Sequence, residues 1–114
     1  MMTLEDFKAA RRVLDGVLHP TDLMYSPFFS KATGNSVYIK PENMQVTGAY
    51  KIRGAYFKCS TLTQEEKERG LITASAGNHA QGVAYAAQAA GIPATVVMPT
   101  TTPLVKVNNT KDYG

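Results

Sequence analysis

The order of hydrophobic and polar positions along the chain predicts a mixed α/β fold. Apolar side chains recur at helical spacing over residues 3–18, where Thr3 and Asp6 can form a capping box. A second helix is predicted over 50–61, and the stretch 36–40 alternates like a short strand. The apolar stripe of the first helix comprises Leu4, Phe7, Leu14, Val17 and Leu18, and that of the second comprises Ile52, Ala55, Tyr56, Cys59 and Leu62.

The second half of the chain has the order of a βαβ unit. Thr63 and Glu66 predict a capped short helix that stops at Gly70. A brief buried strand over 71–74, an alanine-rich helix over 79–90 and a strand over 94–98 follow. This order requires a parallel sheet with a right-handed crossover. We also expect a helix over 103–111, helices on both faces of the sheet, and irregular chain over 19–35, which contains two prolines.

Composition and charge exclude several classes of function. The chain has 114 residues, near the size of one domain, and a net charge of +3 from scattered basic residues, which does not indicate nucleic-acid binding. The single cysteine, Cys59, cannot form an internal disulfide, and His19 and His79 lack the spacing of metal ligands. No stretch has the length of a membrane span or the features of a signal peptide, so a cytoplasmic protein is expected.

Lys51 is the first residue with a candidate chemical role. It lies at the edge of the apolar face of the predicted helix, one turn from Gly54 and Ala55, which leave room for a flat group beside the amine. A lysine in this position commonly extends its amine into solvent while its stem packs on apolar surface. A desolvated amine can instead act as a nucleophile. The pattern alone leaves both interpretations open.

The second candidate is the loop between the strand at 71–74 and the alanine-rich helix. Its sequence is Ser75-Ala76-Gly77-Asn78, followed by His79. Backbone N–H groups at such a turn, together with the helix dipole, can bind an anion such as a carboxylate or a phosphate. An ordinary capped turn would have the same composition. The chain has no G-x-G-x-x-G motif and no P-loop, so a phosphate-bearing cofactor needs a cradle formed elsewhere.

Two long motifs resemble those of a known enzyme family. KPENMQVTGAYKIRGAY (40–56) and ITASAGNHAQGVAYAAQAAGIPATVVMP (72–99) are similar to sequences of threonine dehydratases, which are pyridoxal-phosphate enzymes of fold type II. The likeness extends over essentially the whole chain. It implies a partial fold-type II architecture and β-elimination of water from L-threonine or L-serine, which gives a 2-oxo acid and ammonia.

The resemblance also implies a role for each matching residue. Lys51 would form the Schiff base with pyridoxal 5′-phosphate and then remove the α-proton of the substrate. Tyr50 would pack near the cofactor, and Asn78 would hydrogen-bond the hydroxyl of its ring. The substrate carboxylate would be held by Ser75, Gly77, Asn78 and His79, and Val46, Thr47 and Gln81 are possible effector contacts. Related racemases have a serine as second acid–base group where this chain has Ala76, so elimination is preferred and a serine-racemase-like activity is the alternative.

Members of this family are several hundred residues long, and their phosphate-binding glycine loop matches no part of this chain. The resemblance therefore implies an N-terminal piece of the large domain over about 1–47 and the first part of the small domain over about 48–114. We expect a truncated chain that is inactive alone, with a homo-oligomer, a dimer or tetramer, as the family assembly. The alternative is a non-catalytic remnant that self-associates through its open sheet edges. No metal, nucleic acid or membrane partner is expected.

Overall fold

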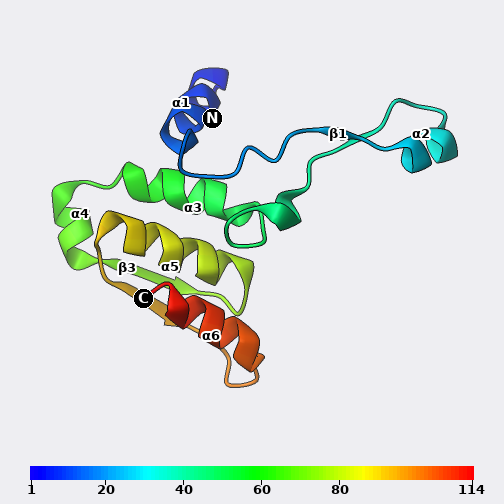
Figure 1. Cartoon of the computed structure of the whole chain (residues 1–114). Coiled ribbons are helices and arrows are strands. Elements are labelled where there is room, and N and C mark those ends of the chain that lie inside the picture. Colours follow the sequence, from blue (N-terminus) through cyan, green and yellow to red (C-terminus); the bar gives the residue numbers. More distant parts are fainter.

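The computed structural model describes all 114 residues and shows two parts (Figure 1). An N-terminal helix and an extended arm precede a compact unit of helices around a two-stranded parallel sheet. The helices are α1 (Leu4–Leu14), α2 (Pro27–Thr33), α3 (Lys51–Ser60), α4 (Gln64–Arg69), α5 (Asn78–Ala90) and α6 (Leu104–Asp112), with a 3₁₀ turn, η1, at Glu42–Met44. The strands are β1 (Met24–Tyr25), β2 (Tyr38–Ile39), β3 (Leu71–Ala74) and β4 (Ala94–Val97).

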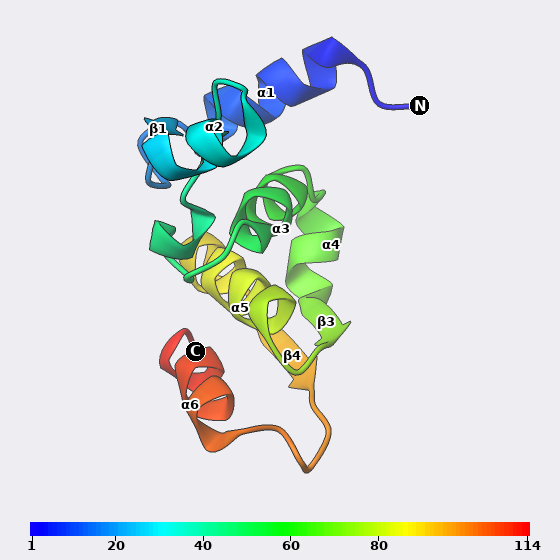
Figure 2. The ribbon, with the colours of Figure 1, turned by 90° about the vertical axis from the view of Figure 1, so that its right-hand side faces the viewer.

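The predicted βαβ unit is confirmed. Strands β3 and β4 are parallel, with Leu71 opposite Ala94 and Ala74 opposite Val97, and α5 connects them. Helix α5 packs on one face of this pair and lies between α3 and α6 (Figure 2). Helices therefore cover one face within these residues, rather than both faces as expected. The opposite face exposes Ile72 (78%) and Val97 (54%), so β3 is half-buried and not fully buried as predicted.

The core is built from small side chains that let α3 and α5 approach closely. Ala80, Ala84, Ala86 and Ala87 of α5 are all buried, and a Cβ at Gly82 would lie 3.3 Å from the Cα of Ile52. Four alanines and a glycine supply little apolar area of their own. Their main effect is that the backbones of α3 and α5 lie close together, which fixes the start of α3 against α5.

The local predictions for the first helix have different outcomes. Its capping box is confirmed, because the Thr3 hydroxyl accepts from the Asp6 N–H and the Asp6 carboxylate accepts from the Thr3 N–H at 2.7 Å. The helix ends at Leu14 and not at residue 18, since Gly16 adopts a left-handed conformation with φ of 71°. The predicted stripe is buried only at Leu18, which follows the helix, because no residue of α1 itself is buried.

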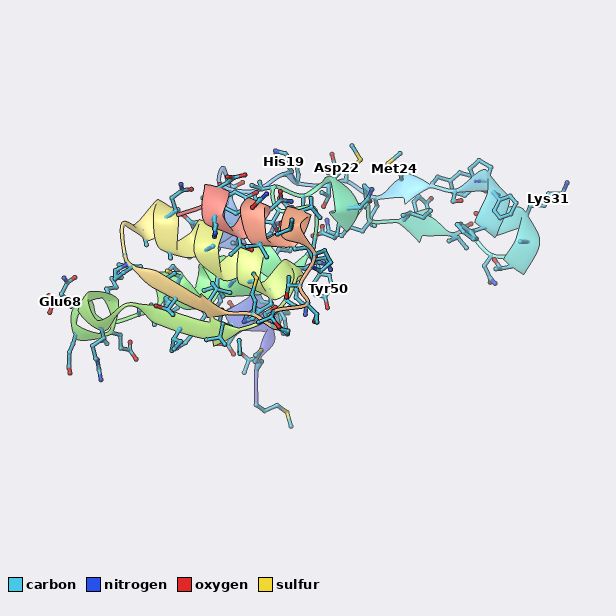
Figure 3. The ribbon with its side chains drawn as sticks, turned by 90° about the horizontal axis from the view of Figure 1, so that it is seen from below. His19, Asp22, Met24, Lys31, Tyr50 and Glu68 are labelled. Atoms are coloured by element: carbon cyan, nitrogen blue, oxygen red, sulfur yellow. The ribbon has the colours of Figure 1, made fainter.

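The segment 19–35 is more regular than predicted. Strands β1 and β2 pair antiparallel, and α2 lies between them, with Ser26 as its cap, Pro27 in its first turn and Gly34 after its end. We define residues 24–39 as the arm. It projects away from the rest of the molecule, and Lys31 lies at its far end (Figure 3). The prolines predict breaks in the chain, whereas Pro27 lies in the first turn of α2, where proline is favoured.

The helices of the chain are short, and none of them combines the length and the apolar character needed to cross a membrane.

Candidate functional site

The carboxyl ends of β3 and β4 lie beside the N-termini of α3, α5 and α6 (Figure 1). Helices α3 and α5 run in the same direction, since Ile52 lies against Gly82 and the Cys59 thiol approaches the Ala86 carbonyl at 3.6 Å. Helix N-termini carry partial positive charge and unpaired N–H groups, and parallel sheets bind ligands at the carboxyl ends of their strands. This end of the molecule is therefore the candidate site.

Lys51 is the first residue of α3 and its side chain is exposed. None of the four ion pairs of the chain involves this amine. The following residue, Ile52, is completely buried, so the backbone beside Lys51 is held in the core while the amine stays accessible. Tyr50, the preceding residue, is 63% exposed and lies at the same end of the helix. The predicted apolar face of α3 is confirmed at Ile52 and Cys59, which are both buried.

The loop before α5 is organised by Ser75. Its hydroxyl oxygen accepts from the N–H groups of Gly77 and Ala80, each at 3.3 Å, while its own N–H donates to the Val97 carbonyl at 3.0 Å. Asn78 and His79 are the first two residues of α5, so their N–H groups have no carbonyl within the helix to which they can donate. Both residues are exposed. Two backbone donors and the proton of the Ser75 hydroxyl are thus available to an anion.

Ile52 and Gly82 bring Lys51 and this loop to the same place. Gly82 is four residues after Asn78 and so lies on the same face of α5. Because Gly82 touches the backbone of Ile52, Lys51 and Asn78 come from the adjoining first turns of two packed helices. The sequence predicted each group of residues separately, and the structure brings them together.

Sequence reasoning missed Lys106, a third contributor to this end of the molecule. Its ammonium group lies 3.6 Å from the position that a Cβ on Gly77 would occupy. Lys106 belongs to the first turn of α6, which was predicted only as a helix without a role. No local pattern distinguishes this lysine from the others, because its approach to Gly77 depends on how α6 packs against α5.

The three predicted effector positions are less accessible. Thr47 and Gln81 are buried, with an exposure of 7% each. The Val46 carbonyl accepts a long hydrogen bond of 3.5 Å from the Tyr113 hydroxyl. Their effector role stays a prediction.

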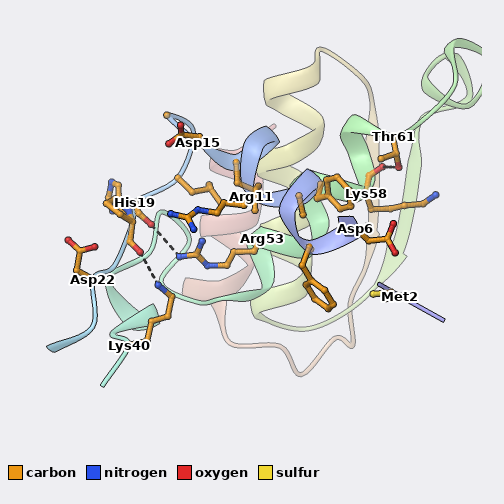
Figure 4. A pocket seen from close by; sticks show the side chains of 18 of the residues that line it. Met2, Asp6, Arg11, Asp15, His19, Asp22, Lys40, Arg53, Lys58 and Thr61 are labelled. Carbon is orange, nitrogen blue, oxygen red and sulfur yellow. Dashed lines mark hydrogen bonds between the residues drawn. The ribbon is translucent and has the colours of Figure 1, made fainter. Parts of the chain in front are cut away.

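A second feature missed from the sequence is an ion pair beside the site. Arg53 donates two hydrogen bonds to the Glu42 carboxylate, at 2.9 Å from Nε and 2.8 Å from Nη2. Hydrogen bonds from Arg53 hold the pKa of Glu42 below its ordinary value, and the carboxylate in turn raises the pKa of Arg53. Figure 4 shows Arg53 beside His19 on the wall of a groove of about 1310 Å³ between α1 and α3.

His19 and His79 belong to separate parts of the structure. The Nδ1 atom of His19 lies 3.0 Å from the Met44 carbonyl oxygen, and His79 is the second residue of α5. No group of three or more histidine, cysteine, aspartate or glutamate side chains is arranged to hold a metal ion.

Comparison with known proteins identifies close relatives of this chain. The family model described as pyridoxal-phosphate dependent enzyme matches residues 14–114. The chain is 56% identical over 114 residues to the L-threonine ammonia-lyase of Thermotoga maritima, covering 100% of this chain and 28% of that protein. It thus spans less than a third of the length of this relative.

Solved structures give the same result. Maize serine racemase matches 97% of the chain, or 34% of its own length, with 38% identity and a TM-score of 0.91. The processed form of threonine deaminase isoform 2 from Solanum lycopersicum matches the whole chain, or 34% of its own length, with 40% identity and a TM-score of 0.82. The predicted fold class, a partial fold-type II architecture, is confirmed by these matches.

Proposed function

The chain belongs to the family of pyridoxal-phosphate dependent enzymes, and we propose that the protein eliminates water from L-threonine or L-serine to give a 2-oxo acid and ammonia. The observation that carries this proposal is the placement of the Lys51 amine and the 75–79 loop at the N-termini of two packed helices. The names of the relatives favour the same reaction, since two of the three are a threonine ammonia-lyase and a threonine deaminase.

The residues at this end fit the reactive part of the cofactor. An exposed amine outside every ion pair can bind an aldehyde, and an exposed aromatic ring beside it offers a surface for a flat group. Lys51 would hold pyridoxal 5′-phosphate covalently, Tyr50 would pack near it, and Asn78 would hydrogen-bond the hydroxyl of its ring. When bound, the cofactor supplies an electron sink for a carbanion at the α-carbon of an amino acid.

The substrate carboxylate would lie against the loop of Ser75, Gly77, Asn78 and His79. The N–H groups of Asn78 and His79 would donate to its oxygens, as the Ser75 hydroxyl would. The positive end of the α5 dipole favours a negative charge at this point. Lys51, released from the cofactor, would then act as the base that takes the proton from the α-carbon. This arrangement would fix the substrate at one end while the proton transfer would occur at the other.

Elimination is favoured over racemisation by residue 76. Reprotonation of the α-carbon from the opposite side needs an acid, and the methyl group of Ala76 cannot supply a proton. The likeness to maize serine racemase keeps a racemase-like activity as the second candidate. The division into large- and small-domain pieces near residue 47, an effector role for Val46, Thr47 and Gln81, assembly into a homo-oligomer and a cytoplasmic location are further parts of the proposal.

The test is a trapping experiment. The purified protein is incubated with pyridoxal 5′-phosphate and reduced with borohydride, and the modified lysines are located by peptide mass spectrometry. We expect an adduct at Lys51 that is lost in Lys51→Ala, with little modification of exposed Lys58. The same preparation is assayed with L-threonine for release of a 2-oxo acid. Equal modification of many lysines would contradict the assignment of Lys51, and formation of D-serine from L-serine without a 2-oxo acid would favour racemisation.

A further inference from the structure

We propose that a cluster of Glu42, Arg53 and Thr21 positions the Lys51 amine for its reaction. This inference rests on the proposed function, because it assigns to the cluster a role in the chemistry of Lys51. None of the three side chains would touch the substrate or the cofactor, so each would act as a positioning residue. We call this group the clamp.

The clamp joins three segments that are distant in the sequence. The Arg53 guanidinium donates to both oxygens of Glu42 and to the Thr21 hydroxyl at 3.0 Å. It also donates to the His19 carbonyl at 3.3 Å (Figure 4). The Thr21 hydroxyl lies within hydrogen-bond distance of the same Glu42 carboxylate. One side chain of α3 therefore holds both the 3₁₀ turn η1 and the segment that precedes the arm.

Further contacts hold the partners of Arg53 in place. Lys40 donates to the carbonyls of Pro20 and Thr21, at 3.0 and 2.9 Å. The Gln45 side chain accepts from the His19 N–H at 3.0 Å and donates to the His19 carbonyl at 2.8 Å. Gln45 and Thr21 are both buried. Side-chain hydrogen bonds thus fix the backbone of the segment that carries Thr21.

The backbone of Thr21 shows that the clamp holds the chain against a local preference. Thr21 is the only residue other than glycine with a positive φ, at 48°. A β-branched residue avoids this region, so its occupation is unfavourable. The hydrogen bonds of the Thr21 hydroxyl with Arg53 and Glu42 offset that cost. Such strain persists where surrounding contacts determine the conformation.

The position of the clamp explains why it would act on Lys51. No side chain caps the N-terminus of α3, so the first turn of this helix lacks the usual restraint. Arg53 lies in that first turn, two residues after Lys51, and Ile52 between them is fixed against Gly82 of α5. The first turn is therefore held on one side by the core and on the other by the clamp. Lys51 is the residue whose backbone these two restraints control.

Partial burial makes the pair stronger than an ordinary surface ion pair. The side chains of Arg53 and Glu42 are 30% and 17% exposed, and their bonds are bidentate. The chain offers a matched comparison in the pair of Arg69 and Glu65, which are 68% and 80% exposed and 3.3 Å apart. Exposed pairs of this kind contribute little to stability.

The test compares the rate of trapping at Lys51 in Glu42→Gln, in Glu65→Gln and in the wild-type protein. The first substitution removes the charge from the clamp and keeps the shape of the side chain. We expect the rate at Lys51 to fall about tenfold in Glu42→Gln, because misplacement of a reacting group by an ångström can cost about a hundredfold. The rate at Lys58 and the circular dichroism spectrum should stay unchanged, and Glu65→Gln should match the wild type. If the clamp only stabilised the fold, Glu42→Gln would lower trapping at all lysines together, and only to the extent that the protein unfolds.

Two further readouts separate the possible outcomes. In a protein with the full length of the relatives, we expect kcat for L-threonine to fall and KM to stay unchanged in Glu42→Gln, since the carboxylate loop is not part of the clamp. Arg53→Lys keeps the cation but not the bidentate geometry, so it should trap at an intermediate rate. Rates within twofold of the wild type in both variants, or loss of the fold in both, would overturn the proposal. Absence of a Lys51 adduct in the wild-type protein would instead contradict the proposed function.

Discussion

The contact between Gly82 and Ile52 allows a quantitative test of the packing that holds Lys51. In Gly82→Ala, the new methyl group would lie 3.3 Å from the Cα of Ile52, and 3.4 Å from both the Ile52 nitrogen and the Ala55 Cβ. These distances are a few tenths of an ångström shorter than ordinary contacts. Two of the three atoms belong to the backbone of a fully buried residue, so a change of side-chain rotamer cannot relieve them. The helices must move apart.

The magnitude follows from two opposing terms. Alanine is favoured over glycine inside a helix by about 1 kcal/mol, while an extra methyl in a filled core costs about 1–3 kcal/mol. Gly54→Ala provides the control, because Gly54 lies inside α3 and nothing lies within 4 Å of its Cβ position. The helical term is common to both variants. The difference in free energy of unfolding between them should therefore equal the cost of overlap, about 1–3 kcal/mol, with Gly82→Ala the less stable.

The assay is urea or thermal unfolding followed by circular dichroism. A difference of 1 kcal/mol corresponds to about 4 °C in the unfolding midpoint for a chain of this size. We also expect slower trapping at Lys51 in Gly82→Ala, because the start of α3 moves with the helix, and no such change in Gly54→Ala. Equal stabilisation of the two variants would refute the reasoning, since it would mean that α3 and α5 have room for the methyl group.

Two further predictions concern titratable groups. Because hydrogen bonds from Arg53 lower the pKa of Glu42, this carboxylate stabilises the folded state above its unfolded pKa, and the stabilisation is lost as the pH falls through the lower folded value. Unfolding midpoints measured between pH 7 and pH 3 should therefore fall less in Glu42→Gln than in the wild type, whereas a steeper fall would contradict the ion pair. Burial raises the pKa of the Cys59 thiol, so iodoacetamide should modify it slowly at pH 8 and faster in urea. Rapid modification of the folded protein, measured by mass spectrometry, would show that the α3–α5 contact opens readily.

Local signals in the sequence were sufficient to predict both capping boxes and the βαβ unit of the second half. The capping boxes at Thr3 and Thr63 have the predicted bonds, and the parallel pairing of β3 and β4 follows from the order of the elements. These features depend on residues three or four apart, or on a connection that allows one topology. Helix α2 also has local signals in Ser26, Pro27 and Gly34. The two prolines of the segment nevertheless predict irregular chain, so the helix is not predicted.

The contacts that build the site have no local signal. Arg53 is 11 residues from Glu42, which begins the 3₁₀ turn η1, and 32 from Thr21, which lies in irregular chain. Lys106 approaches Gly77 only because α6 packs on α5. Charge and spacing cannot predict such pairs, since many arginines and glutamates have equivalent sequence surroundings. The resemblance supplied Lys51 and the carboxylate loop, but not the contacts that hold them.

The arm, residues 24–39, has a consequence for how the molecule opens. Its strands pair only with each other, and Met24, Phe28 and Tyr38 are exposed by more than half. Backbone amides there can reach water without disturbing α3 or α5, whereas those of α5 are enclosed by neighbouring elements. Deuterium uptake should thus be fast in the arm and slow in α5, with an intermediate rate in η1 where the clamp begins. We therefore expect the molecule to open in two separate cooperative units, with the clamp at the border between them.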